Sequence, residues 1–321
     1  MIQIVLYNKY DKIAKAYRDE IVKSDIWNKI QQSLSDLIAD IESNKDGKPY
    51  INYIDWIKNN LRDLIIMHPS EFPTLYEVLT NAYNCKMEWS GWKTECKTEF
   101  GTRIANALHY GDVREKILPK YIDQLGIKTC VYCNIQYALT TKKRSGRGVA
   151  YYELDHAWPK SEYPYLALSF FNFHPCCGSC NRHKSTYSPK PPYTIYNEEV
   201  KPMVLFSIKN ESLVNYILTN QSSKLDIDMQ TDSSIAELYS RLGILKQYKL
   251  LQNEAEDIVW QTRIFNDNYC QQLAMTYKSS FLNSKVNLYR LLYGVYAGEK
   301  NVYIRPLTKF RQDIIKQLEE R

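Results

Sequence analysis

The sequence predicts a mainly α-helical protein with a small α+β insert that a metal ion stabilises. Apolar residues recur with helical spacing before residue 126 and again after residue 233. Two C-x-x-C pairs lie in between, and the stretch that they bracket consists of short strand-like runs and turns punctuated by Gly, Pro and Ser. We therefore expect a helical region over 1–126, the insert over 127–192 and a second helical region over 193–321.

The N-terminal region has the pattern of successive amphipathic helices. Apolar residues between 13 and 21 fall on one helical face, and the same spacing returns between 30 and 41. A turn is expected over NKDGKPY (44–50). Further helices are expected from Pro73, from Arg103 to His109, and from Val113 to Leu125, where Gly126 would end the last one.

A basic loop separates two strands that we expect in the insert, Ile135–Leu139 and Val149–Leu154. The loop is either a solvated hairpin tip or a phosphate-tracking element, and the sequence leaves both open. Beyond the insert, MVLFSI (203–208) predicts one more strand, and a final helix is expected over Leu307–Arg321. The cations of the basic loop are Lys142, Lys143, Arg144 and Arg147.

The charge balance of the chain is mildly basic. It has 321 residues, a formal net charge of +6 and a pI near 8.7. This suits a polyanionic partner such as DNA or RNA without requiring one. No run reaches the roughly 18 apolar residues that cross a bilayer, and the N-terminus lacks the basic-then-apolar order of a signal peptide. We therefore expect a cytoplasmic protein with no membrane partner.

Four cysteines form two knuckles, Cys130 with Cys133 and Cys177 with Cys180. Two thiolates spaced by two residues can chelate one ion while the backbone turns around it, and two such pairs complete a closed, structural zinc site. Cys176 is an alternative to Cys177, which we favour because it repeats the spacing of the first knuckle. Buried free thiols are the other interpretation, and the turn-rich segment between the pairs argues against it. The remaining cysteines are expected in the core: Cys85, Cys96 and Cys270.

Residues between and beside the knuckles have the chemistry to hydrolyse a phosphodiester. That reaction needs a base to activate water and a divalent cation to neutralise charge on the phosphate. His156 is the candidate base, because a neutral imidazole accepts a proton at about pH 7. Asp155 and Asn181 offer hard oxygen donors for Mg²⁺ or Mn²⁺, and Asn172 would orient His156 through its amide or its backbone carbonyl. The candidate phosphate contacts are Lys160, Arg182 and Lys184.

Two further histidines lie near this set. His183 follows Asn181 by two residues, so on a helix it should point away from the site. His174 precedes Pro175 and is expected to be structural.

The motif residues resemble those of the HNH, or ββα-metal (His-Me finger), endonucleases in their zinc-supported form. The resemblance rests on L-D-H-x-x-P-K-S, a mid-loop Asn and C-x-x-C-N-x-x-K, and it covers Lys128 to Pro189. It implies two antiparallel strands, a loop and a short helix around one catalytic cation. Asp155 and Asn181 match the metal-ligand positions, His156 the general base and Asn172 the central Asn. Many members carry His where this chain has Asn181, which implies Mg²⁺ or Mn²⁺ as the catalytic cation.

As a whole the chain is similar to the PtuB-like HNH effectors of Septu and retron anti-phage systems, which implies an ABC-like ATPase partner. A stand-alone restriction or homing DNA endonuclease is one alternative, although it would need a DNA-reading module that we do not recognise. A zinc-organised nucleic-acid-binding protein without catalysis is another. The sequence leaves open whether DNA or RNA is the target.

Overall fold

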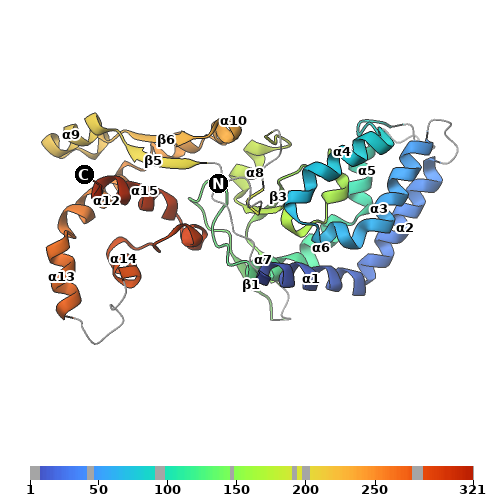
Figure 1. Ribbon diagram of the computed structural model, residues 1–321, viewed down its shortest axis with the longest axis horizontal. Coiled ribbons are helices and arrows are strands. Elements are labelled where there is room, and N and C mark those ends of the chain that lie inside the picture. The colour runs from blue at the N-terminus through green and yellow to red at the C-terminus, as the bar shows by residue number, and fades with distance from the viewer. Residues whose placement is uncertain are drawn as a thin grey trace.

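The chain folds into a mainly helical protein, which we describe from a computed structural model. The described residues are 8–41, 47–90, 98–144, 148–189, 194–196, 203–276 and 285–320. Within them, the strands form two-stranded antiparallel sheets, which confirms a mainly α class with a small β component. Figure 1 shows β3 (Glu153–His156) and α8 (Gly178–Lys184) in the middle, with N-terminal helices on one side and C-terminal elements on the other. No helix of the described ranges is both long and apolar enough to cross a membrane.

The N-terminal region is a bundle of helices whose apolar faces meet in one core. Helix α3 packs against α1 and α2, and Tyr17, Ile30 and Ile57, one from each helix, are fully buried. The helical periodicity of this region is therefore confirmed. The helices are α1 (Asn8–Lys23), α2 (Asp25–Ile41), α3 (Lys48–Ile66), α4 (Phe72–Tyr83), α5 (Phe100–Ala107), α6 (Tyr110–Lys116) and α7 (Leu118–Gln124), with the 3-10 turn η1 at Pro69–Glu71.

Two helix boundaries differ from those that hydrophobic periodicity predicts, and a proline explains each difference. The helix expected over Val113–Leu125 is two helices, α6 and α7, because Pro119 in the first turn of α7 lacks the N–H that would continue α6. Helix α3 begins at Lys48 with Pro49 in its first turn, so residues 48–50 of the expected turn are helical, and residues 44–46 lie outside the described ranges. Gly126 follows α7 with a φ of +76°, the conformation of a helix-ending glycine.

The strands of the insert pair differently from the expected hairpin. Strand β1 (Thr140–Lys142) pairs with β2 (Gly148–Ala150), and β3 pairs with β4 (Phe173–Cys176). The run Val149–Leu154 is thus divided between two sheets. Ile135–Leu139 forms no strand; its Tyr137 bridges Thr129 because the chain turns back through the first knuckle. Arg147 of the basic loop lies outside the described residues.

The C-terminal region combines one sheet with helices. Strand β5 (Val204–Ile208) confirms the strand expected at 203–208, whereas its partner β6 (Ile227–Thr231) was not expected. The helices are α9 (Asn210–Thr219), α10 (Ser233–Arg241), α11 (Ile244–Tyr248), α12 (Gln252–Ile264), α13 (Asp267–Thr276), α14 (Lys285–Tyr293) and α15 (Thr308–Glu319), with 3-10 turns η4 (Ser222–Lys224) and η5 (Glu299–Ile304).

Helix α15 covers the outer edge of β5 with side chains. The Phe206 N–H donates to Asp313 Oδ2 at 2.9 Å, and the Ile208 N–H donates to Gln317 Oε1 at 2.8 Å. The Gln317 amide returns a bond to the Ile208 carbonyl at 2.7 Å. The edge strand therefore finds hydrogen-bond partners in side chains of the last helix.

The first knuckle joins the insert to the C-terminal region through Asn134. The Asn134 amide donates to the Val302 carbonyl at 3.0 Å, and its Oδ1 accepts from the Lys309 N–H at 3.1 Å. Its backbone carbonyl accepts from the Leu307 N–H at 2.7 Å, and the neighbouring Cys133 carbonyl accepts from the Tyr248 hydroxyl at 2.7 Å. On the other side, Tyr17 donates to the Leu168 carbonyl, so both flanks are fastened to the insert.

Replacing Gly101 should destabilise the contact between α5 and the insert. A Cβ on Gly101 would lie 2.0 Å from the Ser161 carbonyl oxygen, so backbone must move. We expect Gly101→Ala to lower the free energy of unfolding in urea by about 2 kcal/mol. Gly111→Ala is the matched control, because nothing lies within 4 Å of the added carbon and alanine raises helix stability by up to about 1 kcal/mol. Equal effects of the two changes would contradict this packing.

Candidate functional site

The four knuckle cysteines come together in the folded chain. The Sγ atoms of Cys130, Cys133, Cys177 and Cys180 all lie within 4.8 Å of one another, and all four residues are buried. Four sulfur donors at this spacing match the tetrahedral ligand set that structural zinc prefers. The cluster is therefore able to hold a metal ion such as zinc.

Backbone amides in both knuckles point at sulfur. The Ile135 N–H donates to Cys133 Sγ at 3.4 Å, and the Cys180 N–H donates to Cys177 Sγ at 3.4 Å. Asn134 turns the first knuckle with a φ of +54°, which asparagine tolerates better than most residues. Amide donors stabilise the thiolate form that binds metal, so the local fold supports the ligand set.

Cys176 stands apart from the cluster. It is the last residue of β4, opposite Glu153, and burial raises the pKa of its thiol, which favours the protonated form. The cluster of four sulfurs therefore includes Cys177, as the spacing favoured, and not Cys176. Cys85 and Cys270 are half-buried instead of lying in the core, and Cys96 falls outside the described residues.

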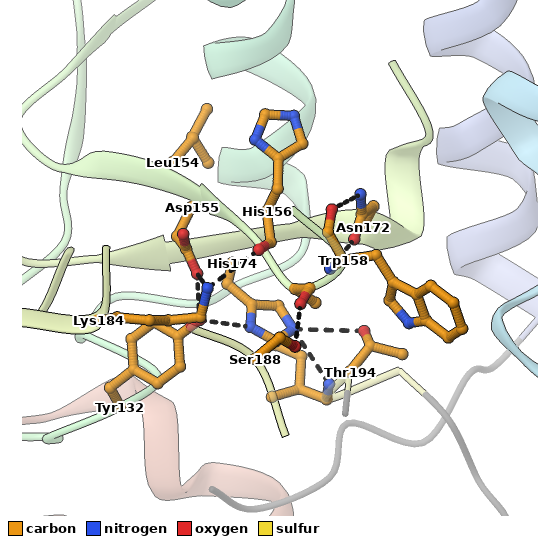
Figure 2. A network of polar contacts seen from close by, with 12 residues as sticks. Tyr132, Leu154, Asp155, His156, Trp158, Asn172, His174, Lys184, Ser188 and Thr194 are labelled. Carbon is orange, nitrogen blue, oxygen red and sulfur yellow. Dashed lines mark hydrogen bonds and ion pairs between the residues drawn. The ribbon is translucent and has the colours of Figure 1, made fainter. Parts of the chain in front are cut away.

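Strands β3 and β4 present two different faces. Asp155 lies opposite His174 in the register, and His156 lies opposite Phe173. Successive side chains of a strand point to opposite sides, and Figure 2 shows the His156 ring directed away from the Asp155 carboxylate. Between the strands the chain passes through the 3-10 turns η2 (Pro164–Leu166) and η3 (Phe170–Asn172).

On the first face, Asp155 belongs to a buried polar network. Its Oδ2 contacts Lys184 Nζ at 2.9 Å and also accepts a hydrogen bond from the Tyr132 hydroxyl. Lys184 donates as well to the His156 carbonyl at 3.2 Å. Burial raises the pKa of the Asp155 carboxyl, while Lys184 and Tyr132 oppose that shift. The carboxylate is thus neutralised by a lysine within the fold (Figure 2).

His174 completes this network and has a defined tautomer. Its Nε2 accepts from the Ile195 N–H at 3.2 Å, so the proton resides on Nδ1, which lies 3.1 Å from the Tyr132 hydroxyl. Burial lowers the pKa of His174 well below its usual value, which keeps the ring neutral. Its expected structural role agrees with these contacts.

On the second face, His156 packs among aromatic rings. Its ring centroid lies 4.7 Å from that of Tyr110 and 5.2 Å from that of Phe173. His156 Nε2 lies 3.0 Å from the Ala167 carbonyl oxygen. Because a carbonyl can only accept, Nε2 carries the proton and Nδ1 is the acceptor nitrogen. Burial is the main reason why the pKa of His156 falls to about 3, so the imidazole is neutral at physiological pH.

The polar groups of Asn172 bond to other residues than His156, so the expectation that Asn172 orients the His156 ring is wrong. Its Oδ1 accepts from the Trp158 N–H at 2.8 Å, and its amide donates to the Trp158 and Leu166 carbonyls at 3.0 and 3.1 Å. Its backbone carbonyl accepts from the Ala157 N–H. Asn172 therefore shapes the loop, and the Ala167 carbonyl orients His156. Sequence reasoning could not have identified the Ala167 carbonyl, because every residue has a backbone carbonyl and its neighbours here are apolar.

The expected phosphate contacts divide into buried and accessible side chains. The expectation that Lys184 contacts phosphate is wrong, because only 2% of its side chain is exposed and its charge pairs with that of Asp155. Lys160 is half-buried beside His156, with its Nζ 4.7 Å from the Tyr110 ring centroid. Arg182 is exposed, and Asn181 is half-buried, on α8. His183, also exposed, bonds back to the Ser179 carbonyl at 2.8 Å, as expected of a residue that points away.

Arg114 is an accessible cation that the sequence did not single out. It lies in α6 and pairs with Glu153 at the start of β3. Its charge also lowers the pKa of His156 and of Lys160, which places all three side chains in one electrostatic neighbourhood. A lone arginine in an amphipathic helix offers no signal that would have identified it.

Metal content should distinguish the two adjacent cysteines. We expect one zinc ion per chain by elemental analysis of purified protein, and we expect Cys176→Ala to retain it. Cys177→Ala should lose the ion and roughly 3 kcal/mol or more of stability, because metal binding and folding are coupled. Zinc retained in Cys177→Ala and lost in Cys176→Ala would contradict the ligand set.

Replacing the Asn172 amide by a carboxylate should weaken the loop. Asn172→Asp keeps the size but turns two hydrogen-bond donors toward carbonyls into acceptors, in a residue that is fully buried. We expect the free energy of unfolding to fall by about 3 kcal/mol. Asn181→Asp, at a half-buried position, is the control and should cost far less. A neutral Asn172→Asp would show that these bonds do not hold the loop.

What is known of the site comes from the residues that form it. No family model, no curated protein and no solved structure matches the chain. The geometry establishes a buried cluster of four cysteines that can hold a metal ion, next to a strand pair that separates Asp155 from His156.

Proposed function

We propose that this chain is a metal-dependent nuclease of the HNH type that hydrolyses nucleic-acid phosphodiesters. One observation carries the proposal: β3 and β4 pair, α8 follows at once, and the four-cysteine cluster anchors the unit. Asp155 and His156 end β3, and Asn181 lies on α8, which packs against β3. The HNH resemblance implies this order of elements and residues.

His156 is the base in this proposal. Its bond to Ala167 leaves the lone pair on Nδ1, and its burial keeps the ring neutral and able to accept a proton. A pKa of about 3 makes the resting imidazole a weak base. A phosphate anion beside the ring would raise that pKa, because a nearby negative charge favours the imidazolium form. Basicity would therefore develop when substrate binds.

Asp155 and Asn181 are the proposed oxygen donors to a catalytic Mg²⁺ or Mn²⁺, which would neutralise charge on the scissile phosphate. Lys184 and Tyr132 both contact Oδ2 of Asp155, so we assign Oδ1 to the cation. The positive charge of Lys184 disfavours a second cation nearby. We therefore expect weak metal binding until a phosphate adds its own negative charge.

Accessible cations beside this unit fit a polyanionic substrate. Arg114 lies in α6, Arg182 in α8 and Lys160 in the turn that follows β3, and the chain as a whole has a net charge of +6. Phosphate contacts of this kind position a nucleic acid without selecting its sequence. The proposal therefore covers DNA and RNA alike.

A nucleic-acid-binding protein without catalysis is the second candidate, and two observations favour it: the Asp155–Lys184 pair, and the opposite directions in which the Asp155 and His156 side chains point. A buried carboxylate that is already neutralised by an ammonium group needs no metal. The role of an anti-phage effector with an ATPase partner remains a prediction from the resemblance, and so does a stand-alone restriction or homing activity.

Cleavage assays on plasmid, single-stranded DNA and tRNA with Mg²⁺ or Mn²⁺ test the proposal. We expect His156→Ala to reduce the cleavage rate by about 100-fold or more, because it removes the general base. His183→Ala is the matched control, since that exposed ring bonds only to its own helix in the described structure. Metal content should be equal in all variants. Cleavage that survives His156→Ala would contradict the proposed base, and binding without cleavage by the unmodified chain would favour the second candidate.

A further inference from the structure

A pocket lined by tyrosines lies where α3 and α4 meet the loop between β3 and β4. Its volume is about 250 Å³, enough for a small ligand or a single side chain. Tyr53 comes from α3, Tyr76 from α4, and Tyr163 and Tyr165 from the loop. The pocket is separate from the four-cysteine cluster, because none of the four cysteines lines it.

The aromatic rings in the wall are held by one another. The rings of Tyr76 and Tyr163 meet edge to face with centroids 5.4 Å apart. The Trp158 ring centroid lies 4.7 Å from that of Tyr163. Tyr53 packs against Phe100 at 5.8 Å. Rings that are fixed by neighbours lose little entropy when a ligand binds, so the pocket is largely preformed.

One wall residue has an unmet hydrogen-bonding need. Tyr165 is 2% exposed, and its hydroxyl has no partner within the described part of the chain. A buried hydroxyl without a partner costs free energy, and because this oxygen is inaccessible from the pocket, it belongs to the wall and makes no contact with a ligand. The phenol is neutral, since burial raises its pKa far above the physiological range.

The charged groups at the pocket are two carboxylates and one ammonium. Glu88 and Glu162 are exposed at its rim together with Lys86, which leaves a net negative charge in a chain that is positive overall. The wall thiol of Cys85 adds no charge, because burial raises its pKa to about 12. Aromatic faces, phenol oxygens and carboxylates together attract cations that carry hydrogen-bond donors.

We propose that this pocket binds an organic cation of the guanidinium or alkylammonium type, such as an arginine side chain. The tyrosine rings contact the apolar stem and face the charge, and the carboxylates accept hydrogen bonds at the rim. The carboxylates oppose the entry of phosphate groups, so a nucleotide fits less well. This assignment is independent of the proposed nuclease activity.

Calorimetry with two probes of nearly equal shape tests the charge requirement. We expect propylguanidinium to bind the full-length chain with a Kd of about 1 mM. Propylurea, which lacks the charge, should bind about tenfold more weakly. Equal affinity for the two probes, absence of saturable guanidinium binding, or tighter binding of adenosine would each overturn the assignment.

Variants locate the binding in the pocket. Tyr76→Ala and Glu162→Gln change exposed residues and should weaken propylguanidinium binding about fivefold or more. Tyr151→Ala, at a tyrosine that is 68% exposed outside the pocket, is the control and should leave affinity unchanged. Unaltered binding in both pocket variants would place the ligand elsewhere.

Discussion

The close approach of four sulfurs is the constraint on which the middle of this molecule depends. It brings the first knuckle next to the start of α8, and the same knuckle carries the bonds of Asn134 and Cys133 to the C-terminal region. A small unit with little apolar core gains stability from such a cluster once metal is bound. The cluster thus determines how the flanking regions are held as well as the geometry of the strand pair.

The strand pair distributes its polar groups by alternation. The Asp155 carboxylate binds Lys184 and Tyr132, and Tyr132 in turn contacts His174, while His156 faces aromatic rings and nearby cations. A buried charge needs a partner, and the fold provides it on the first face with a lysine. On the second face the imidazole stays neutral because it is buried. Adjacent residues consequently occupy environments that differ in charge and polarity.

The sequence predicted the parts of the fold that depend on local pattern. Hydrophobic periodicity predicted the helices and strand β5. The C-x-x-C spacing predicted which cysteines cluster. Residues close in sequence determine each of these features. The sequence did not predict the features that contacts between residues distant in sequence determine. The division of Val149–Leu154 between two sheets depends on β4, and the orientation of His156 depends on a backbone carbonyl of Ala167.

The remaining errors have identifiable causes. The break between α6 and α7 was visible in Pro119, and the alternation of Ile227 to Thr231 indicated β6, so closer attention to local rules would have found both. The burial of Lys184 has no such signal. A lysine in a basic stretch is usually solvated, and only the packing of α8 against β3 reveals its carboxylate partner.

Because side chains of α15 bond to the edge of β5, the last helix prevents that edge from pairing with strands of other molecules. Without α15, the amides of Phe206 and Ile208 would lose Asp313 and Gln317 and stand open along a strand edge. Such an edge templates the addition of further strands from other molecules. Loss of the C-terminal helix, by proteolysis or a premature stop, would therefore turn this small sheet into a starting point for aggregation.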